Sequence, residues 1–213
     1  MPAGRPERPI ADFFINIYAI TKLMTAYRLK ITLRDCEPEC TRILRIPRDI
    51  TFEDLERAIQ IAFEWSGGHA GMFYVADADR YICDPELGIK KSLKPGSNKV
   101  SKFAKSPMTY TYDMGDSWEH DLVFLSNANN DVVSPKIESL VGPSPPEDCG
   151  GVLSYMDYLG PYNDPSSPEH EEAVELFENY NPNPNLEALN ERMKFRFAHM
   201  RKDVYIWVKG RSS

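Results

Sequence analysis

Two short motifs contain most of the side chains in this chain that could do chemistry. Residues 110–120 read YTYDMGDSWEH and residues 145–151 read PPEDCGG, so each motif combines carboxylates with glycine. Carboxylate and imidazole groups are the ligands expected for Mg²⁺, Mn²⁺ or Zn²⁺ acting on phosphoesters, and clustered acids can also serve as general acid and base. The candidate polar site consists of Asp113, Asp116, Trp118, Glu119, His120, Glu147, Asp148 and, from a third segment, His170.

A metal site and a purely structural role are both open for this set. The candidate metal ligands are Asp116, His120 and Glu147. Against them, Asp beside glycine in a tight turn commonly bonds its own backbone, and Trp118 is typical of a core residue. Neighbouring strand residues point to opposite faces, so Glu119 and His120 are not expected to line one pocket. Glu147 and Asp148 could cap the helix that follows them.

No complete catalytic signature accompanies these motifs. The sequence contains no nucleophile elbow, phosphate-binding glycine loop or dinucleotide fingerprint. His69 follows Gly67-Gly68, where it is expected to cap a helix end or make a core hydrogen bond, with metal ligation as the alternative. No cofactor is therefore predicted, a divalent metal is the alternative, and whether the protein is an enzyme stays open.

Charge is distributed unevenly along the chain. The net charge of −7 argues against sequence-independent nucleic-acid binding by the whole surface. Residues 138–191 hold 12 acids and no Lys or Arg, whereas residues 90–105 hold six lysines and no acid. Such runs are usually solvated surface, but they can mark an interaction face. A nucleic-acid-binding alternative would use Lys90, Lys91, Lys94, Lys99, Lys102 and Lys105.

Cysteine usage and hydropathy predict an intracellular, cytoplasmic protein with no membrane association. The cysteines at positions 36, 40, 83 and 149 match neither a zinc finger nor a disulfide framework, so free thiols are expected. No stretch approaches the roughly 20 apolar residues of a membrane span. Polar residues interrupt the apolar segment 10–24, which disfavours a signal peptide and leaves an N-terminal helix or a natural start at Met24 rather than Met1 as alternatives.

The apolar pattern predicts an α+β fold in which antiparallel hairpins form a sheet packed with about four helices in one domain. Thr51 is suited to cap a helix that ends near Ser66-Gly67-Gly68, and Ser167-Pro168 and Asn185 are suited to open two later helices. Another short helix is expected up to residue 159, and residues 84–106 are expected to form a long loop. The expected strands are 27–33, 42–47, 72–76, 109–113, 119–125 and 204–209.

The two motifs also carry a family resemblance. Together with the helix at 51–65, His69 and the segment 164–172 (DPSSPEHEE), they resemble the plasmid pRiA4b ORF-3-like family over about residues 27–193. The resemblance implies strands packed with helices and a biochemical role that is uncharacterised, with some members labelled as transposon passenger proteins or resolvases. No recombinase signature is present in this chain. The chain departs from the family pattern at Glu56, where His is usual, and at Glu64, where Gly is usual.

Residues and resemblance together favour a non-catalytic interaction or accessory module that is linked by resemblance to mobile elements and binds an unidentified protein. A metal-dependent phosphoester hydrolase and a nucleic-acid-binding protein are the alternatives. The expected organisation is an N-terminal extension at 1–23, the α+β domain at 24–193 and a basic C-terminal extension at 194–213.

Overall fold

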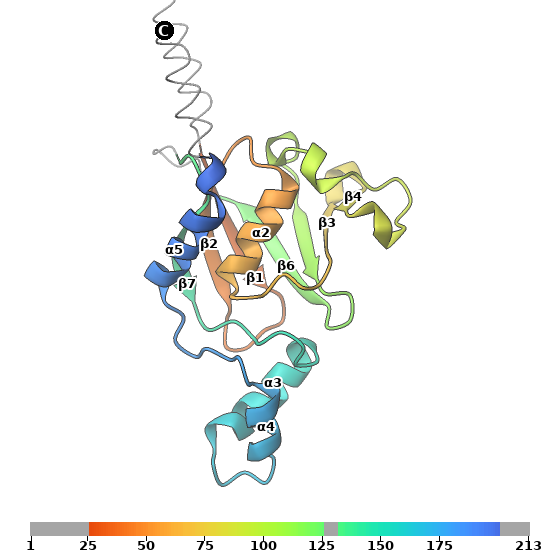
Figure 1. Ribbon diagram of the computed structural model, residues 1–213. Helices are drawn as coiled ribbons and strands as arrows, with labels where there is room; N and C mark the ends of the chain where they lie inside the picture. The colour runs from red at the N-terminus through yellow and green to blue at the C-terminus, as the bar shows by residue number, and fades with distance from the viewer. Residues whose placement is uncertain (1–25, 126–131, 201–213) are drawn as a thin grey trace, which may run out of the picture.

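A seven-stranded antiparallel sheet forms the body of the molecule, in the strand order β4-β3-β5-β6-β1-β2-β7 (Figure 1). The computed structural model describes residues 26–125 and 132–200. The strands are β1 Ala26–Leu33, β2 Thr41–Pro47, β3 Gly71–Val75, β4 Arg80–Cys83, β5 Met108–Tyr112, β6 Trp118–Phe124 and β7 Lys136–Val141. The α-helices of the described residues are α2 Phe52–Ala62, α3 Gly151–Asn163, α4 His170–Leu176 and α5 Leu186–Arg196. The predicted single-domain α+β class is confirmed.

Helices α2 and α5 lie across one face of the sheet, and the strand sequences explain which face they cover (Figure 1). In β1, the fully buried Leu29 and Ile31 alternate with the half-exposed Arg28 and Lys30. Because successive strand residues point to opposite faces, the apolar set faces the helices and the charged set faces away. Removing the apolar side chains from water is the main stabilising term for this two-layer arrangement.

Helix α2 begins as predicted and ends earlier than predicted. Thr51 caps it by accepting a hydrogen bond from the backbone N–H of Asp54 at 3.1 Å. The helix ends at Ala62, and Glu64 then takes the left-handed conformation with φ 62°. This conformation terminates helices and favours glycine, which is the residue usual in the resembled family at this position. The expected stop at Gly67-Gly68 was therefore wrong by one turn.

Several other boundaries differ from the sequence prediction for tertiary reasons. Helix α3 continues through Pro161, because Tyr162 packs on the rings of Phe177 and Tyr180. Helix α4 begins at His170 instead of Pro168, since the hydroxyl of Ser167 accepts from the backbone of Glu169 and closes a turn there. The expected loop 84–106 contains the short 3₁₀ helices η2 Pro85–Leu87, η3 Pro95–Ser97 and η4 Val100–Lys102. The extension at 1–23 and the strand at 204–209 lie outside the described residues.

Helices α3 and α4 form a lobe that projects from one end of the sheet (Figure 1). The lobe has its own aromatic centre, in which Tyr155 stacks on Phe177 with ring centroids 5.6 Å apart. The hydroxyls of Tyr155 and Tyr180 are hydrogen-bonded at 3.1 Å. The longest described helix is α3, with 13 residues, and no helix of the described residues is long and apolar enough to cross a membrane.

A buried arginine joins the two layers. Arg42, on β2, is fully buried and donates to the carbonyl of Ala62 at the end of α2 at 2.8 Å. It also donates to the carbonyls of Val141 and Gly142 at the end of β7, and to the hydroxyl of Ser144 at 2.7 Å. Burial lowers the pKa of Arg42 from its usual value, but an arginine stays charged at neutral pH. The fork of five N–H donors is what allows one side chain to hold three chain segments.

Replacing this arginine is expected to destabilise the fold strongly. Arg42→Met leaves several buried carbonyl oxygens without donors, which should lower the free energy of unfolding by about 3–5 kcal/mol. Arg48→Met is the matched control, because Arg48 is exposed and lies over the ring of Tyr27; its loss should cost about 1 kcal/mol or less. Urea unfolding of both variants measures the difference, and equal losses would contradict the role assigned to Arg42.

Candidate functional site

The two motifs of the sequence meet where the lobe joins the sheet. The carboxylate of Asp116, in the β5–β6 turn, accepts from the backbone N–H of Gly150 at 3.0 Å. Gly151 has φ 80°, and a Cβ atom there would lie 2.6 Å from the carbonyl oxygen of Asp116. The second motif can approach the first so closely only because this position has no side chain. The start of α3 is thus held by Asp116 of the other motif, and not by Glu147 or Asp148 as the sequence suggested.

The second motif is also tied to the segment that leaves α2. The indole Nε1 of Trp65 donates to the carbonyl of Pro145 at 3.0 Å, and the backbone N–H of Ser66 donates to the carboxylate of Glu147 at 2.7 Å. Tyr112 donates its hydroxyl to the same carboxylate and accepts from the backbone N–H of His69 at 3.3 Å. Burial, followed by the bond to Glu147, raises the pKa of Tyr112 above its usual value.

These contacts place the imidazole of His69 between one carboxylate from each motif. Its Nε2 lies 3.0 Å from Oδ1 of Asp148, and its Nδ1 lies 3.5 Å from Oδ2 of Asp113. The Asp113 side chain is 13% exposed and the Asp148 side chain is 72% exposed, so the cluster spans the boundary between interior and solvent. Asp113 and Asp148 both have a left-handed backbone, with φ 56° and 61°. Such backbone strain is concentrated at functional sites in proteins.

The metal ligands predicted from the sequence are not the ones that the fold brings together. Among the described residues, His69, Asp113 and Asp148 form the one group of three potential ligands whose atoms all lie within 4.8 Å of one another. The predicted set of Asp116, His120 and Glu147 forms no such group, because Asp116 binds Gly150, Glu147 binds Ser66 and Tyr112, and His120 is buried. These side chains are of the kinds that bind metals, but in the fold two of them are hydrogen-bonded to other groups and the third is buried.

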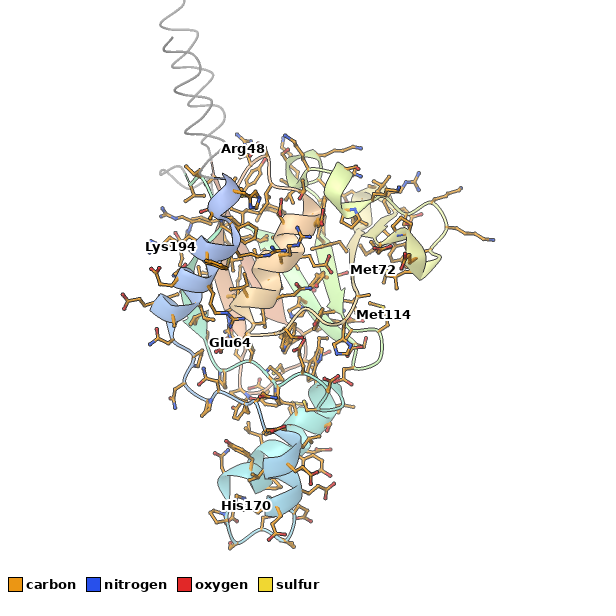
Figure 2. All side chains as sticks on the ribbon, viewed as in Figure 1. Arg48, Glu64, Met72, Met114, His170 and Lys194 are labelled. Carbon is orange, nitrogen blue, oxygen red and sulfur yellow. The ribbon has the colours of Figure 1, made fainter. Side chains whose placement is uncertain are left out.

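The remaining members of the predicted site lie elsewhere. Trp118 and His120 are fully buried on β6, whereas Glu119 between them pairs with Arg34 on the opposite face, as strand alternation predicts. His170 lies at the far end of the lobe, where its Nδ1 contacts the carbonyl of Pro161 at 2.9 Å (Figure 2). Figure 2 also labels Met114 in the β5–β6 turn and Glu64 at the end of α2, both near the junction between sheet and lobe.

His69 also lines a cleft of about 840 Å³ that runs beside α2. One wall is the half-buried polar stripe of α2, and the other is made by residues 84–87 and 94–97. The charged residues of the lining are four acids, Glu53, Glu56, Asp84 and Glu86, and two bases, Arg57 and Lys94. Arg57 is already paired with Glu53 and, at 3.5 Å, with Asp54. The remaining acids of the lining, Glu56, Asp84 and Glu86, outnumber the remaining base, Lys94, so the lining carries an excess of negative charge.

Glu56 gives the cleft a partly desolvated carboxylate. It accepts a hydrogen bond from the hydroxyl of Tyr110 at 3.2 Å, and a Cβ atom at Gly71 would lie 2.2 Å from its Oε1. Burial raises the pKa of Glu56 from its usual value, and the bond from Tyr110 opposes that shift. A carboxylate held in this way gains more than a solvated one from a cation placed beside it, because less water screens the pair.

The lysines of residues 90–105 do not form one surface. Lys94 lines the acidic cleft, whereas Lys105 lines a separate groove with Tyr74, Val123 and Phe124. Lys99 lies 3.7 Å from Asp49, and Lys102 lies over the ring of Phe103. These four lysines therefore have separate surroundings.

All four cysteines are buried as free thiols. Burial raises the pKa of Cys149, in the second motif, to about 12, and it also raises the pKa of Cys36 to about 12. A thiol is nucleophilic and binds metals as its thiolate. Cys149 therefore stays protonated near the His69 cluster at neutral pH.

Comparison with known proteins places the chain in a family. The chain matches the plasmid pRiA4b ORF-3-like protein family over residues 25–188, most of its length. The chain belongs to this family. It is also 29% identical to the uncharacterized protein y4hQ of Sinorhizobium fredii (strain NBRC 101917 / NGR234) over 152 residues, which cover 70% of this chain and 78% of that protein.

A solved structure shares the fold of this family member. It is the crystal structure of protein of unknown function MM3350 from Methanosarcina mazei Go1, with a TM-score of 0.69 and 23% sequence identity. The match covers 78% of this chain and 98% of that chain. Since the identity is low, the likeness supports the architecture of the pRiA4b ORF-3-like domain and carries no function. The family and both relatives are uncharacterised.

Two residues of this region, His69 and Glu56, were not in the predicted site. His69 was expected to have a structural role, and Glu56 was noted only as a departure from the family pattern. The available signal was the position of His69 directly after the glycine pair, because a residue there leaves the helix end and can face a neighbouring turn. Nothing in the sequence indicated which turn that would be.

The burial of His120 predicts that the stability of the fold depends on pH. The His120 ring packs against Phe63 and Trp65, its Nδ1 contacts the carbonyl of Tyr110 at 3.1 Å, and burial lowers its pKa to about 4. Between pH 6.5 and 4 the unfolded chain binds a proton at this histidine that the folded chain does not, so stability falls as the pH falls through this window. From pH 7 to pH 5 the loss should be about 2 kcal/mol.

Urea unfolding at both pH values, for the wild type and His120→Gln, isolates this contribution. The variant should lose about 2 kcal/mol less than the wild type between pH 7 and pH 5, whatever its stability at pH 7. Contributions from the rest of the chain are common to the two proteins and cancel. Equal losses in the two proteins would show that His120 is not the group responsible.

Proposed function

We propose that this pRiA4b ORF-3-like protein is a non-catalytic binding module whose cleft takes a positively charged segment of a partner protein. The observation that carries the proposal is the charge of the cleft, where carboxylates from both walls face a space of about 840 Å³. One of its two cations, Arg57, is neutralised within its own helix. Opposite charges placed across an interface steer association and select the partner.

The dimensions of the cleft suit a short extended segment. Its α2 wall runs from Glu53 to Gln60, which is eight residues of helix and therefore about 10 Å from the first Cα atom to the last. An extended peptide spans about 3.3 Å per residue, so about three residues would lie along this wall. Lysine and arginine side chains would bring their charges to Glu56 and Glu86, and their aliphatic stems would cover the apolar part of the lining.

A non-catalytic role is supported by what the polar groups of the two motifs already do. Asp116 holds the start of α3, Glu147 holds the segment after α2, and His120 is buried in the core. The thiol of Cys149 is buried and has a raised pKa. These groups specify how the lobe, the sheet and α2 fit together. The link to mobile elements remains part of the proposal and rests on resemblance alone.

The nucleic-acid alternative has less support from the charges. A phosphodiester backbone is anionic, and the main cleft has an excess of carboxylates. The lysines that were expected to bind it are divided between the cleft, a separate groove and local pairs. A phosphoester substrate meets the same electrostatic objection in this cleft.

A peptide-binding assay tests the proposal. Fluorescence anisotropy would compare a labelled Lys-Arg-Lys peptide with a Glu-Asp-Glu peptide, both blocked at their termini. The basic peptide should bind at least about tenfold more tightly, and its affinity should fall as salt is added, since the pairs are partly exposed. Glu56→Gln/Glu86→Gln should weaken binding by about tenfold or more, which corresponds to about 1.4 kcal/mol.

The control must remove the same charge from another part of the molecule. Glu171→Gln/Glu178→Gln does so, because both residues are exposed on and after α4 in the projecting lobe. Its affinity for the basic peptide should stay within about twofold of the wild type. An equal loss in both double variants would mean that net charge alone attracts the peptide, and tighter binding of the acidic peptide would overturn the proposal.

A further inference from the structure

The group of His69, Asp113 and Asp148 has a geometry that peptide binding in the cleft does not require. His69 offers two ring nitrogens, and each lies beside a different carboxylate, at 3.5 Å for Asp113 and 3.0 Å for Asp148. The three residues come from the exit of α2, the β5–β6 turn and the second motif. The contacts of Tyr112, Asp116 and Glu147 fix all three segments relative to one another.

We propose that His69 and Asp148 bind a divalent transition-metal ion at the mouth of the cleft, and that Asp113 orients the imidazole. Two ligand atoms on one ion, each at roughly 2.0–2.2 Å, lie roughly 3.0–3.5 Å apart. The separation of 3.0 Å between Nε2 of His69 and Oδ1 of Asp148 falls in this range. The exposed Asp148 side chain can rotate to complete the contact, and the open side of the site leaves positions for water or a ligand.

Asp113 is suited to the orienting role by its burial and by its second oxygen. Its Oδ1 accepts from the backbone N–H of Gly115 at 2.8 Å, which fixes the carboxylate, and its Oδ2 faces Nδ1 of His69. A metal-binding histidine usually donates its other ring N–H to such a carboxylate, which fixes the tautomer and makes the metal-bound nitrogen more basic. Nε2 is then the lone-pair atom that faces Asp148.

The local charge favours a cation. Among the described residues, no lysine or arginine side chain forms an ion pair with Asp113, Asp116, Glu147 or Asp148. An imidazole with carboxylate and water is a donor set for Zn²⁺, Co²⁺, Ni²⁺ or Mn²⁺, whereas Mg²⁺ and Ca²⁺ prefer oxygen alone. Cys149 follows Asp148 in the sequence but is not a member of this group of potential ligands, so a thiolate is not part of the set.

Isothermal titration calorimetry of the chelator-treated full chain with Zn²⁺ tests the site. The wild type should bind one ion at this site, and His69→Gln or Asp148→Asn should weaken binding by at least about 100-fold. Asp113→Asn should weaken it by about 10–100-fold, the range for a partner that orients a ligand. This gradation separates the direct ligands from the orienting residue.

Matched controls exist for both residue types. His170→Gln removes a histidine at the far end of the lobe, and Asp157→Asn removes an exposed acid of α3; both should bind the ion as the wild type does. Thermal unfolding without metal establishes that each variant is folded. Because the assay contains no peptide, failure of the cleft proposal would leave its result unchanged.

The absorption spectrum of Co²⁺ gives a readout besides affinity. Nitrogen and oxygen ligands should give weak visible bands that disappear in His69→Gln, whereas thiolate ligands would add an intense near-ultraviolet band. The proposal is overturned if the wild type binds no ion, since the imidazole is then only an ion-pair partner of the two carboxylates. It is equally overturned if binding survives in His69→Gln or shows the thiolate band.

Discussion

The structure depends on the hydrogen bonds of one buried cation. Arg42 projects from β2 into the layer between sheet and helices, where it holds the last turn of α2, the end of β7 and Ser144. Its guanidinium also lies over the ring of Phe63, 5.0 Å from the centroid. A buried charge of this kind is tolerated only when its donors are satisfied, so the three segments must arrive together or the charge is left unpaired. Arg42 therefore determines the positions from which the site is built.

The segments that Arg42 holds lead directly into the residues of the site. After α2, the chain reaches Trp65 and Ser66, which bind Pro145 and Glu147 of the second motif. Ser144, which Arg42 holds, immediately precedes that motif. Arg42 thus fixes both partners of these contacts, and His69 meets Asp113 and Asp148 only because they are in place. The polar residues of the two motifs accordingly have different tasks: some join the segments, whereas Asp113 and Asp148 lie beside His69.

This division of tasks explains which parts could be predicted from the sequence. The alternation in β1, the capping of α2 by Thr51 and the hairpin around residues 114–117 depend on neighbours along the chain, so local patterns were sufficient to predict them. The early end of α2 was missed because Glu64 takes a conformation that glycine usually takes, and its carboxylate accepts from Asn181, far away in sequence. The continuation of α3 through Pro161 likewise depends on rings from the segment that follows.

The candidate site could be predicted in composition but not in arrangement. The two motifs supplied Asp113 and Asp148 correctly to one region, because Asp113 opens the β5–β6 turn at an end of the sheet and Asp148 lies in the loop before α3. Asp116 and Glu147 have the same chemistry and lie within three residues of them, yet they bind backbone N–H groups, and only the fold distinguishes the two pairs. The role of His69 depends on the meeting of three segments, which no spacing within one segment encodes.

The central claim is that the junction of the two motifs is a binding site as well as a structural joint. Anomalous diffraction from crystals of the full chain soaked in Co²⁺, measured at the cobalt absorption edge, tests this claim most directly. The account predicts an anomalous peak roughly 2.0–2.2 Å from Nε2 of His69 and from the carboxylate of Asp148. A map without that peak, in which His69 remains hydrogen-bonded to Asp148, or with its strongest peak at the cysteines, would contradict the account.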